Sequence, residues 1–335
     1  MHSVSGVQLT TNSVLNWILQ NKEGCIDKQP KYVLAMFFDH LREAYDAIDI
    51  CDHPSATQMT LKKFDEKEYK QNEDLHFVLE VRDIVERSGF FTHFLMHGSC
   101  ADFGLIRGWS DFDSIAVLKR SSLRKKERRG LYEICAQIDN VMRSLDPYQH
   151  HGVHFIHEKE LLSFPNLYVP VRLLSDCKCL MSKSNIKIAQ VNSIDREIQR
   201  FNSIVDTLES AASSGVLAHH AKSGKYLLED YEDPDTMYQL KYLMCVIMLL
   251  PTLWYNLSGV YCRKSDSYDM INSQFSRDQL EFLNACSEVR FTWKKEFHDG
   301  NKIHKQVMLA LGKNYLKRAG KFARLLKENV NELSR

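Results

Sequence analysis

The sequence lacks a long apolar run, a recognisable targeting segment and an excess of charge of either sign. Its most apolar window, residues 242–255, is shorter than the roughly 20 residues of a membrane-spanning helix and contains Pro251. We therefore expect a buried helix there and no membrane partner. The segment that begins at Met1 has no basic stretch followed by an apolar core, so we expect no signal peptide. The formal net charge of +1 gives no global argument for nucleic acid, so any basic surface must be local.

The cysteines lack the regular spacing of a disulfide framework. Nine cysteines are spread irregularly over 335 residues, and Cys177 and Cys179 are closer together than a usual zinc-binding pair. We therefore expect reduced, mostly buried thiols and a cytoplasmic protein. The chain exceeds the usual size of one domain, which favours two domains.

Residues 97–117 carry most of the chemistry that the sequence shows. An apolar run ends at Gly98 and Ser99, and a second apolar run contains Asp111 and Asp113. Because side chains in a strand alternate between its faces, the two aspartates point to the same side. Two neighbouring carboxylates suit a hard divalent cation such as Mg²⁺ or Mn²⁺. The N–H groups of a Gly-Ser turn can receive phosphate oxygens, so the segment predicts a metal site beside a phosphate site.

This segment resembles the signature of the nucleotidyltransferase superfamily, which has the polymerase-beta-like fold. Gly98, Ser99, Ser110, Asp111 and Asp113 match that signature position by position. The resemblance implies that Asp111 and Asp113 are catalytic metal ligands and that Gly98, Ser99 and Ser110 bind the nucleotide. It further implies a nucleoside triphosphate as substrate. ATP is the expected donor, by resemblance to the antibiotic- and protein-modifying branches of the superfamily.

The superfamily usually adds a third carboxylate on a later strand, and the sequence departs from the pattern there. The matching strand, residues 152–156, has His154 in that position. One interpretation is a different strand register, with Glu158 or Glu160 serving instead. In another, His154 is catalytic as a general base, since an ordinary histidine titrates near neutral pH. In a third, the site binds nucleotide without turnover. The alternative to a functional role is that His154 is an ordinary core histidine.

Two more groups of residues are candidates for binding. Lys264 and Ser267 follow the apolar window, and in related transferases a Lys and a Ser of the helical domain reach the triphosphate. The resemblance therefore assigns both to nucleotide binding, although a solvated lysine and a helix cap explain the same residues. The run from Lys119 to Arg129 holds seven cationic residues and one acidic residue. It predicts a local surface for nucleic acid or an acidic acceptor, with a solvated helix start as the alternative.

The expected fold class is α+β: a small twisted mixed sheet with helices, followed by a helical domain. The resemblance makes the first part the nucleotidyltransferase fold. Apolar periodicity predicts helices over 74–88 and 127–145 on one face of a sheet, with strands over 91–97, 112–118 and 152–156. The expected organisation is an N-terminal helical segment at 1–73, a catalytic domain at 74–185 and a helical C-terminal domain at 186–335.

The leading functional hypothesis is an enzyme that transfers a nucleoside monophosphate, AMP by resemblance, from a nucleoside triphosphate to a hydroxyl and releases pyrophosphate. The acceptor is a small molecule, a protein side chain or a nucleotide. The competing hypothesis is a catalytically impaired, nucleotide-binding regulatory or antitoxin-like module. A third hypothesis, an RNA-end-modifying enzyme, rests on the run from Lys119 to Arg129 alone.

Overall fold

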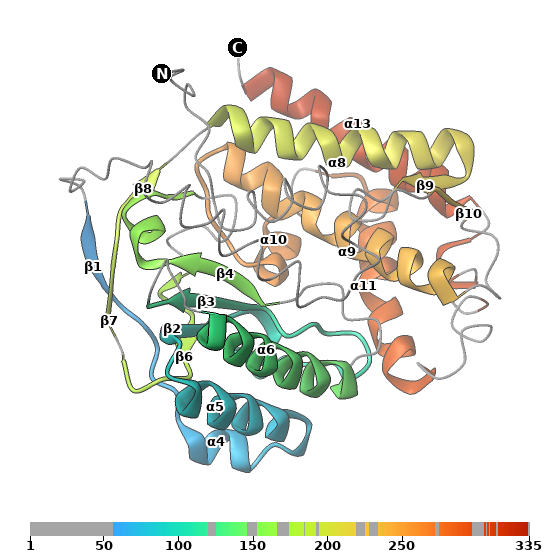
Figure 1. Cartoon of the computed structure of the whole chain (residues 1–335). Coiled ribbons are helices and arrows are strands. Elements are labelled where there is room, and N and C mark those ends of the chain that lie inside the picture. Colours follow the sequence, from blue (N-terminus) through green and yellow to red (C-terminus); the bar gives the residue numbers. More distant parts are fainter. Residues whose placement is uncertain are drawn as a thin grey trace. The chain divides into compact units, whose positions relative to one another are not determined.

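The structure, a computed structural model, divides the chain into two compact units (Figure 1). It describes residues 56–119, 125–145, 153–165, 174–183, 185–191, 194–218, 225–227, 234–271, 275–296, 305, 307, 309–312 and 314–333. Unit 1 comprises Met1–Leu105, Ser110–Pro165 and Leu174–Val191, and unit 2 comprises Ile106–Trp109, Asn166–Leu173 and Asn192–Arg335. Residues 1–55 of the predicted N-terminal helical segment lie outside the described residues.

Unit 1 is built around a four-stranded mixed sheet. Its strands, in spatial order, are β4 (His154–His157), β3 (Ser114–Leu118), β2 (Phe91–Met96) and β6 (Lys178–Cys179). β2 runs antiparallel to β3 and to β6, and β3 runs parallel to β4. The three predicted strands are therefore neighbours in one sheet, which confirms the α+β class. β6 was not predicted, because a two-residue strand has no alternation to detect.

Two helices cover one face of this sheet (Figure 1). They are α5 (His76–Ser88) and α6 (Lys125–Leu145), close to the predicted bounds. α5 ends at Gly89, whose φ of +69° is the left-handed conformation that stops many helices. The apolar stripes of both helices share one core with the sheet. This core includes Val78, Val81, Ile84, Val85, Phe94, Phe112, Ala116, Leu131, Ile138, Val141 and Met142.

Shorter elements complete unit 1. β1 (Thr57–Thr60) pairs antiparallel with β7 (Asn185–Ile188), although the sequence had assigned residues up to 73 to a helical segment. The short helix α4 (Glu66–Lys70) and the turn η1 (Glu73–Leu75) lead into α5. After β4 come the turn η3 (Glu158–Ser163) and the parallel pair β5 (Phe164–Pro165) and β8 (Gln190–Val191).

Unit 2 is largely helical. Its described elements are α8 (Ile194–Ser214), β9 (Val216–Ala218), β10 (Lys225–Leu227), α9 (Pro234–Leu257), α10 (Lys264–Ile271), α11 (Arg277–Glu296) and α13 (Tyr315–Leu333). α9 carries the apolar window and packs against α8, α10, α11 and α13. Its stretch Leu240–Leu257 is apolar enough for a membrane span, but 72% of it is buried inside the structure. The predicted buried helix is confirmed, and a cytoplasmic location stays a prediction.

The described cysteines behave as the sequence predicts. No disulfide joins them, and most are buried. Burial, together with the nearby carboxylate of Asp176, raises the pKa of the Cys177 thiol to about 12. Such a thiol stays protonated at neutral pH, which suits a structural cysteine better than a metal ligand.

Candidate functional site

The turn after β2 brings Gly98 against Asp113. Gly98 opens the short 3-10 turn η2 (Gly98–Cys100) with a φ of +64°. The backbone N–H of His97 donates to the carbonyl oxygen of Asp113 at 3.1 Å. A Cβ atom on residue 98 would lie 2.6 Å from Oδ2 of Asp113. The missing side chain of Gly98 therefore makes room for the aspartate.

The carbonyl oxygen of Gly98 accepts the backbone hydrogen bonds of the same turn. The N–H groups of Ala101 and Asp102 both donate to the carbonyl oxygen of Gly98, at 3.0 and 3.1 Å. The N–H groups that open a helical turn have no acceptor within it, so they can receive phosphate oxygens. This geometry is compatible with nucleotide binding by Gly98 and Ser99. Ser110 is buried, with 8% of its surface exposed, and its role stays a prediction.

Phe112, which lies between the two aspartates in the sequence, indicates on which side of the sheet they lie. It is fully buried in the core under α5 and α6, where its ring meets the edge of the Phe77 ring with centroids 5.6 Å apart. Asp111 and Asp113 are half-buried and do not belong to that core. Both aspartates precede β3, which begins at Ser114, and do not lie within the strand as predicted; if the alternation of β3 continues back through them, both carboxylates lie on the side away from α5 and α6.

The thiol of Cys100 lies near both carboxylates. Its Sγ is 3.8 Å from the carbonyl oxygen of Asp111. Burial raises the pKa of the Cys100 thiol well above its ordinary value, and the charges of Asp113 and Asp111 raise it further. A convergence of the two carboxylates on one divalent cation stays a prediction.

Asp111 and Asp113 form a pair of carboxylates without a third ligand in the described residues. There, no group of three or more His, Cys, Asp or Glu side chains is placed to hold a metal ion. Mg²⁺ is commonly held by one or two carboxylates together with substrate phosphates and waters. The donor chemistry of the pair thus fits a cation that arrives with a nucleotide.

The strand register places His154 at the same end of the sheet as the aspartates. β3 and β4 are parallel, with Ile115 paired to His154. Asp113 precedes Ile115 by two residues, so the three residues share one face of the sheet where the backbone is extended. His154 is half-buried and opens β4. The register agrees with the position expected of His154 from the resemblance, and its role stays a prediction.

The same register disfavours the two glutamates as substitutes. Leu118, at the far end of β3, pairs with His157, and Glu158 follows immediately. At about 3.3 Å per residue, five residues of β3 separate this end of the sheet from Asp113 by up to about 16 Å. Glu158 and Glu160 both belong to η3, beyond that end. The interpretation that one of them completes the site is not supported.

A lysine that the sequence analysis missed lies next to the turn. Lys178 of β6 pairs with Met96, and its side chain is only 8% exposed. Its Nζ lies 3.8 Å from the ring centroid of Phe103 and 4.9 Å from that of Tyr69. Burial lowers the pKa of Lys178, while Glu68, whose Oε2 is 3.6 Å from Nζ, raises it.

This aromatic cluster holds the segment that follows Gly98. The hydroxyl of Tyr69 donates to the carbonyl oxygen of Cys100 at 3.0 Å. Phe103 has a φ of +60°, which a residue with a side chain rarely adopts. No sequence pattern indicated this cluster, because Tyr69, Phe103 and Lys178 come from three distant segments.

Lys264 and Ser267 both belong to α10 in unit 2. Ser267 is fully buried; its hydroxyl donates to the carbonyl oxygen of Lys264 at 2.7 Å and accepts from Thr252 at 3.2 Å. These bonds make Ser267 part of the core of unit 2, so we do not retain it as a phosphate ligand. Tyr268 donates to the carbonyl oxygen of Met248 at 3.1 Å, which is also a packing role. The role of Lys264 stays a prediction.

The basic run from Lys119 to Arg129 is described only in part. Lys119 is exposed, residues 120–124 lie outside the described residues, and Lys125 begins α6. Arg129 forms an exposed ion pair with Glu133 one turn further on, at 3.0 Å. This arrangement agrees with a solvated helix start, and a nucleic-acid role stays a prediction.

No protein-family model matches the chain, and no match was found among the curated proteins or the solved structures compared with it. The functional argument therefore depends on the residues themselves and on how the structure arranges them.

Proposed function

We propose that this protein is a divalent-metal-dependent nucleotidyltransferase with the nucleotidyltransferase fold. It transfers a nucleoside monophosphate, with AMP as the expected group, from a nucleoside triphosphate to a hydroxyl acceptor. The observation that carries the proposal is the fit of Asp113 against Gly98, where a side chain would leave only 2.6 Å to Oδ2. The antiparallel pairing of β2 with β3 thus brings the two halves of the motif together, and the absence of a side chain on Gly98 leaves room for the carboxylate between them.

The proposed reaction assigns a task to each residue. The oxygen of the acceptor hydroxyl attacks the α-phosphorus, the bond to the bridging oxygen of pyrophosphate breaks, and the hydroxyl proton passes to a base. The turn at Gly98 and Ser99 binds phosphate oxygens through its N–H groups. Asp111 and Asp113 hold Mg²⁺ or Mn²⁺, which neutralises triphosphate charge when bound. His154, at the same end of the sheet, is the candidate base.

Removing one carboxylate charge tests this proposal. Asp111→Asn and Asp113→Asn keep the shape of the side chain but weaken the hold on a divalent cation. We expect each variant to lose metal-dependent transfer of label from α-labelled ATP to an acceptor in cell extract. The thermal midpoint of unfolding should change little. The matched control is Asp83→Asn, an exposed carboxylate on α5. Transfer that survives in both site variants would overturn the mechanism.

His154 favours a second candidate, a nucleotide-binding module that does not turn over, because the usual third carboxylate is absent from its place. If His154 is the base, transfer should fall as the pH drops below its pKa, since only neutral imidazole accepts a proton. His154→Ala should then lose a factor of roughly 10²–10⁴, and His154→Glu should keep or raise activity.

Nucleotide binding separates the two candidates. A module would bind ATP with Mg²⁺ equally well in wild type, His154→Ala and His154→Glu and would show no transfer in any of them. Equal transfer by wild type and His154→Ala would remove His154 from the mechanism while leaving the metal site in place.

A further inference from the structure

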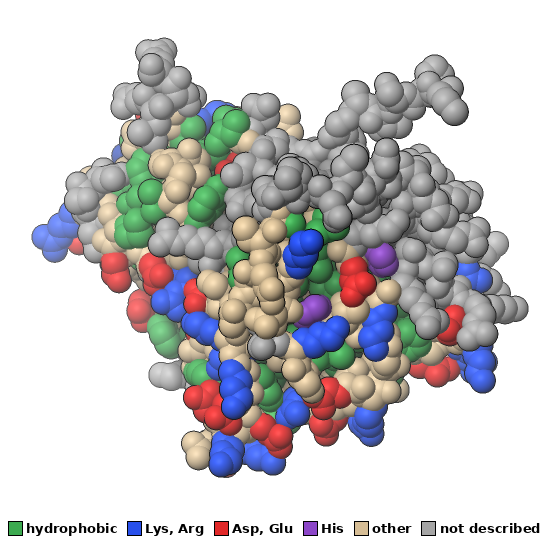
Figure 2. Space-filling view, turned by 90° about the vertical axis from the view of Figure 1, so that its left-hand side faces the viewer, with side chains coloured by type: hydrophobic (Ala, Val, Ile, Leu, Met, Phe, Trp, Pro, Cys, Tyr) green, Lys and Arg blue, Asp and Glu red, His purple; other side chains and the backbone are tan. Residues whose placement is uncertain are grey.

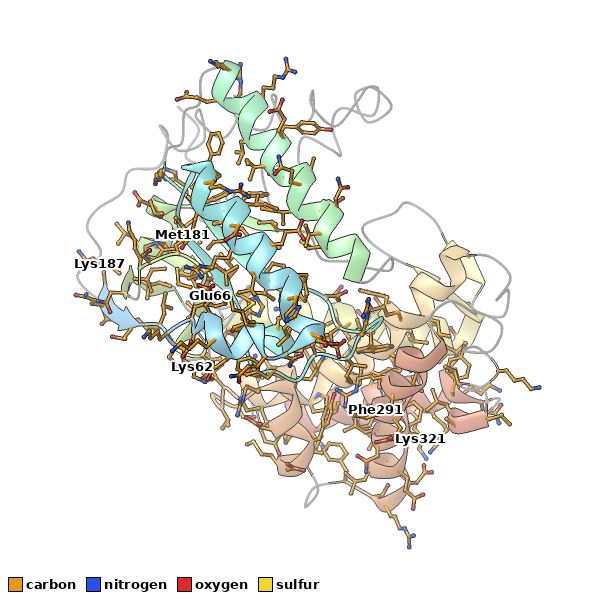
Figure 3. All side chains as sticks on the ribbon, turned by 90° about the horizontal axis from the view of Figure 1, so that it is seen from below. Lys62, Glu66, Met181, Lys187, Phe291 and Lys321 are labelled. Carbon is orange, nitrogen blue, oxygen red and sulfur yellow. The ribbon has the colours of Figure 1, made fainter. Side chains whose placement is uncertain are left out.

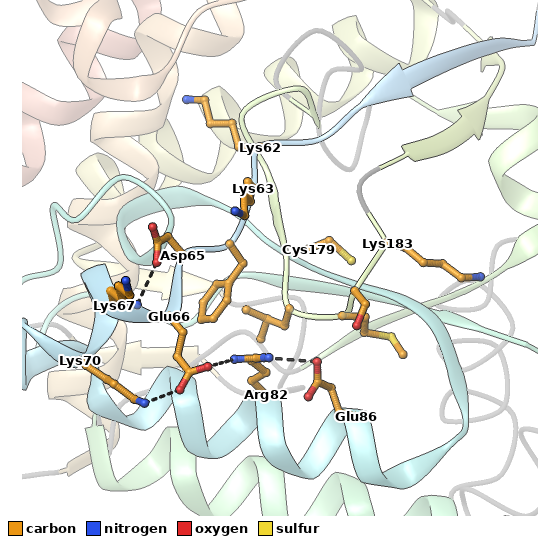
Figure 4. Close-up of a pocket in the computed structure, with 14 residues that line it drawn as sticks. Lys62, Lys63, Asp65, Glu66, Lys67, Lys70, Arg82, Glu86, Cys179 and Lys183 are labelled. Carbon is orange, nitrogen blue, oxygen red and sulfur yellow. Dashed lines mark hydrogen bonds and ion pairs between the residues drawn. The ribbon is translucent and has the colours of Figure 1, made fainter.

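A pocket lies in unit 1, and its lining includes neither aspartate. It is formed by the segment Lys62–Lys70, by α5 and by the segment Cys179–Lys183 after β6 (Figure 4). Seen from below, Lys62, Glu66 and Met181 lie around the same region of unit 1 (Figure 3). The pocket has a volume of about 480 Å³. Pockets that bind small molecules usually have roughly 300–1,000 Å³.

Cationic side chains dominate the lining. Six of them face three carboxylates, in a chain whose net charge is only +1. The six cations are Lys62, Lys63, Lys67, Lys70, Arg82 and Lys183.

The three carboxylates are engaged with donors of their own wall. Glu66 lies between Lys70 and Arg82, and Arg82 also bonds to Glu86 at 3.3 Å. Asp65 caps α4 by accepting the backbone N–H two residues ahead of it at 3.0 Å. These contacts are the dashed lines in Figure 4. The glutamates thus offset the charges of Lys70 and Arg82.

Three lysines of the lining have charges that no carboxylate offsets among the described residues. Among the described residues, no ion pair includes Lys63, Lys67 or Lys183, and all three are exposed. Lys63 and Lys67 belong to one wall and Lys183 to the other. An anion on one side of the pocket would leave the other wall unsatisfied, so a ligand with several separated negative groups fits better.

The floor between these walls is apolar. Leu180 is buried, and Phe64 and Met181 are half-buried. The guanidinium of Arg82 lies over the Phe64 ring, 5.3 Å from its centroid. An apolar floor can pack against the carbon framework of a ligand whose negative groups contact Lys63, Lys67 and Lys183.

We propose that this pocket binds a small organic polyphosphate, meaning a compact carbon ring that carries two or more phosphate groups. The pocket lining mixes Lys and Arg with Asp and Glu, and both kinds of charge are also interspersed on the face of the molecule in Figure 2, whereas a nucleic-acid strand needs a continuous basic surface. The inference stands beside the proposed transferase activity and does not depend on it.

Binding of inositol hexakisphosphate, used as the probe, tests the pocket. The full-length protein is titrated by calorimetry in 150 mM KCl with EDTA, so that no divalent cation recruits the probe to the aspartates. We expect the triple variant Lys63→Gln, Lys67→Gln, Lys183→Gln to bind at least about tenfold more weakly, which corresponds to about 1.4 kcal/mol. Ser182→Glu, a single exposed substitution in the lining, should weaken binding as well.

Matched controls distinguish a general loss of positive charge from the loss of this particular pocket. The triple variant Lys126→Gln, Lys317→Gln, Lys321→Gln removes the same charge from exposed positions outside the lining and should change the affinity less than about twofold. Asp113→Asn should bind the probe as wild type does, whatever happens to transfer. No binding by wild type, equal loss in both triple variants, or loss in Asp113→Asn would each overturn the inference. Pocket-dependent binding of a single-stranded RNA oligonucleotide without binding of the probe would overturn it as well.

Discussion

At the scale of single residues, Gly98 combines two demands that can be separated by substitution. Its φ of +64° disfavours any side chain, and its neighbour Asp113 leaves no room for a Cβ atom. Gly98→Ala should lose about 1–2 kcal/mol of unfolding free energy through the backbone alone. Because the methyl group would also displace the carboxylate, metal-dependent transfer should fall by roughly 10² or more. Denaturant unfolding and the transfer assay measure the two effects.

Gly89 provides the matched control. It has a φ of +69°, but nothing lies within 4 Å of the place that its Cβ would occupy. Gly89→Ala should therefore lose a similar amount of stability, about 1–2 kcal/mol, while transfer at saturating substrate is unchanged. If both variants kept full transfer, the contact between Gly98 and Asp113 would have no catalytic meaning.

The residues of the candidate site differ in how far the sequence predicted them. Gly98, Asp111 and Asp113 could be found because the chemistry lies in one short segment and the alternation of side chains is local. Lys178 could not, since its surroundings are formed by Tyr69 and Phe103 across the fold. A lone lysine in a sequence gives no sign that it will be buried.

At the scale of elements, the packing of α8 against α13 depends on a glycine in the second helix. A Cβ atom on Gly320 would lie 2.7 Å from Cβ of Ala212 and 3.4 Å from the carbonyl oxygen of Leu208. Alanine in a helix is usually more stable than glycine by about 1 kcal/mol, but overpacking costs about 1–3 kcal/mol. Gly320→Ala should therefore lose up to about 2 kcal/mol in denaturant unfolding instead of gaining stability.

The facing alanine makes this test specific. Ala212→Gly alone should destabilise α8, whereas in the Gly320→Ala background it removes the close contact. The double variant should then be more stable than the sum of the two single changes indicates, by about 0.5 kcal/mol or more. Simple additivity would show that the helices adjust and that their spacing is not set by this contact.

The helices and strands were predicted where their periodicity was long. α5 and α6 have continuous apolar stripes, and β2 and β3 are wholly buried strands with apolar runs. β6 and the pairing of β1 with β7 were missed, because pairing between distant segments leaves no local pattern. For the same reason the pocket between Lys62 and Lys183 could not be foreseen: its two walls meet only in the folded chain.

At the scale of the whole molecule, the division into two units has a thermodynamic consequence. The turn at Gly98 and both aspartates belong to unit 1, and Lys264 belongs to unit 2. A ligand that binds only the folded state stabilises the unit that holds it, by about 2.7 kcal/mol at a hundredfold excess over Kd. A nucleotide can therefore report which unit binds it, provided that each unit is followed by its own signal.

Tryptophan fluorescence supplies a signal for unit 2. In a variant with Trp17→Phe and Trp109→Phe the remaining tryptophans, Trp254 and Trp293, both belong to unit 2, while calorimetry follows the whole chain. ATP with Mg²⁺ should raise a calorimetric transition, and no rise would contradict the proposed function. A rise of the fluorescence transition that Lys264→Gln abolishes would give Lys264 the phosphate role that the resemblance implies. If the fluorescence transition stays in place while the calorimetric one moves, the nucleotide is held by unit 1 alone, because a unit that makes no contact with the ligand gains no stability from it.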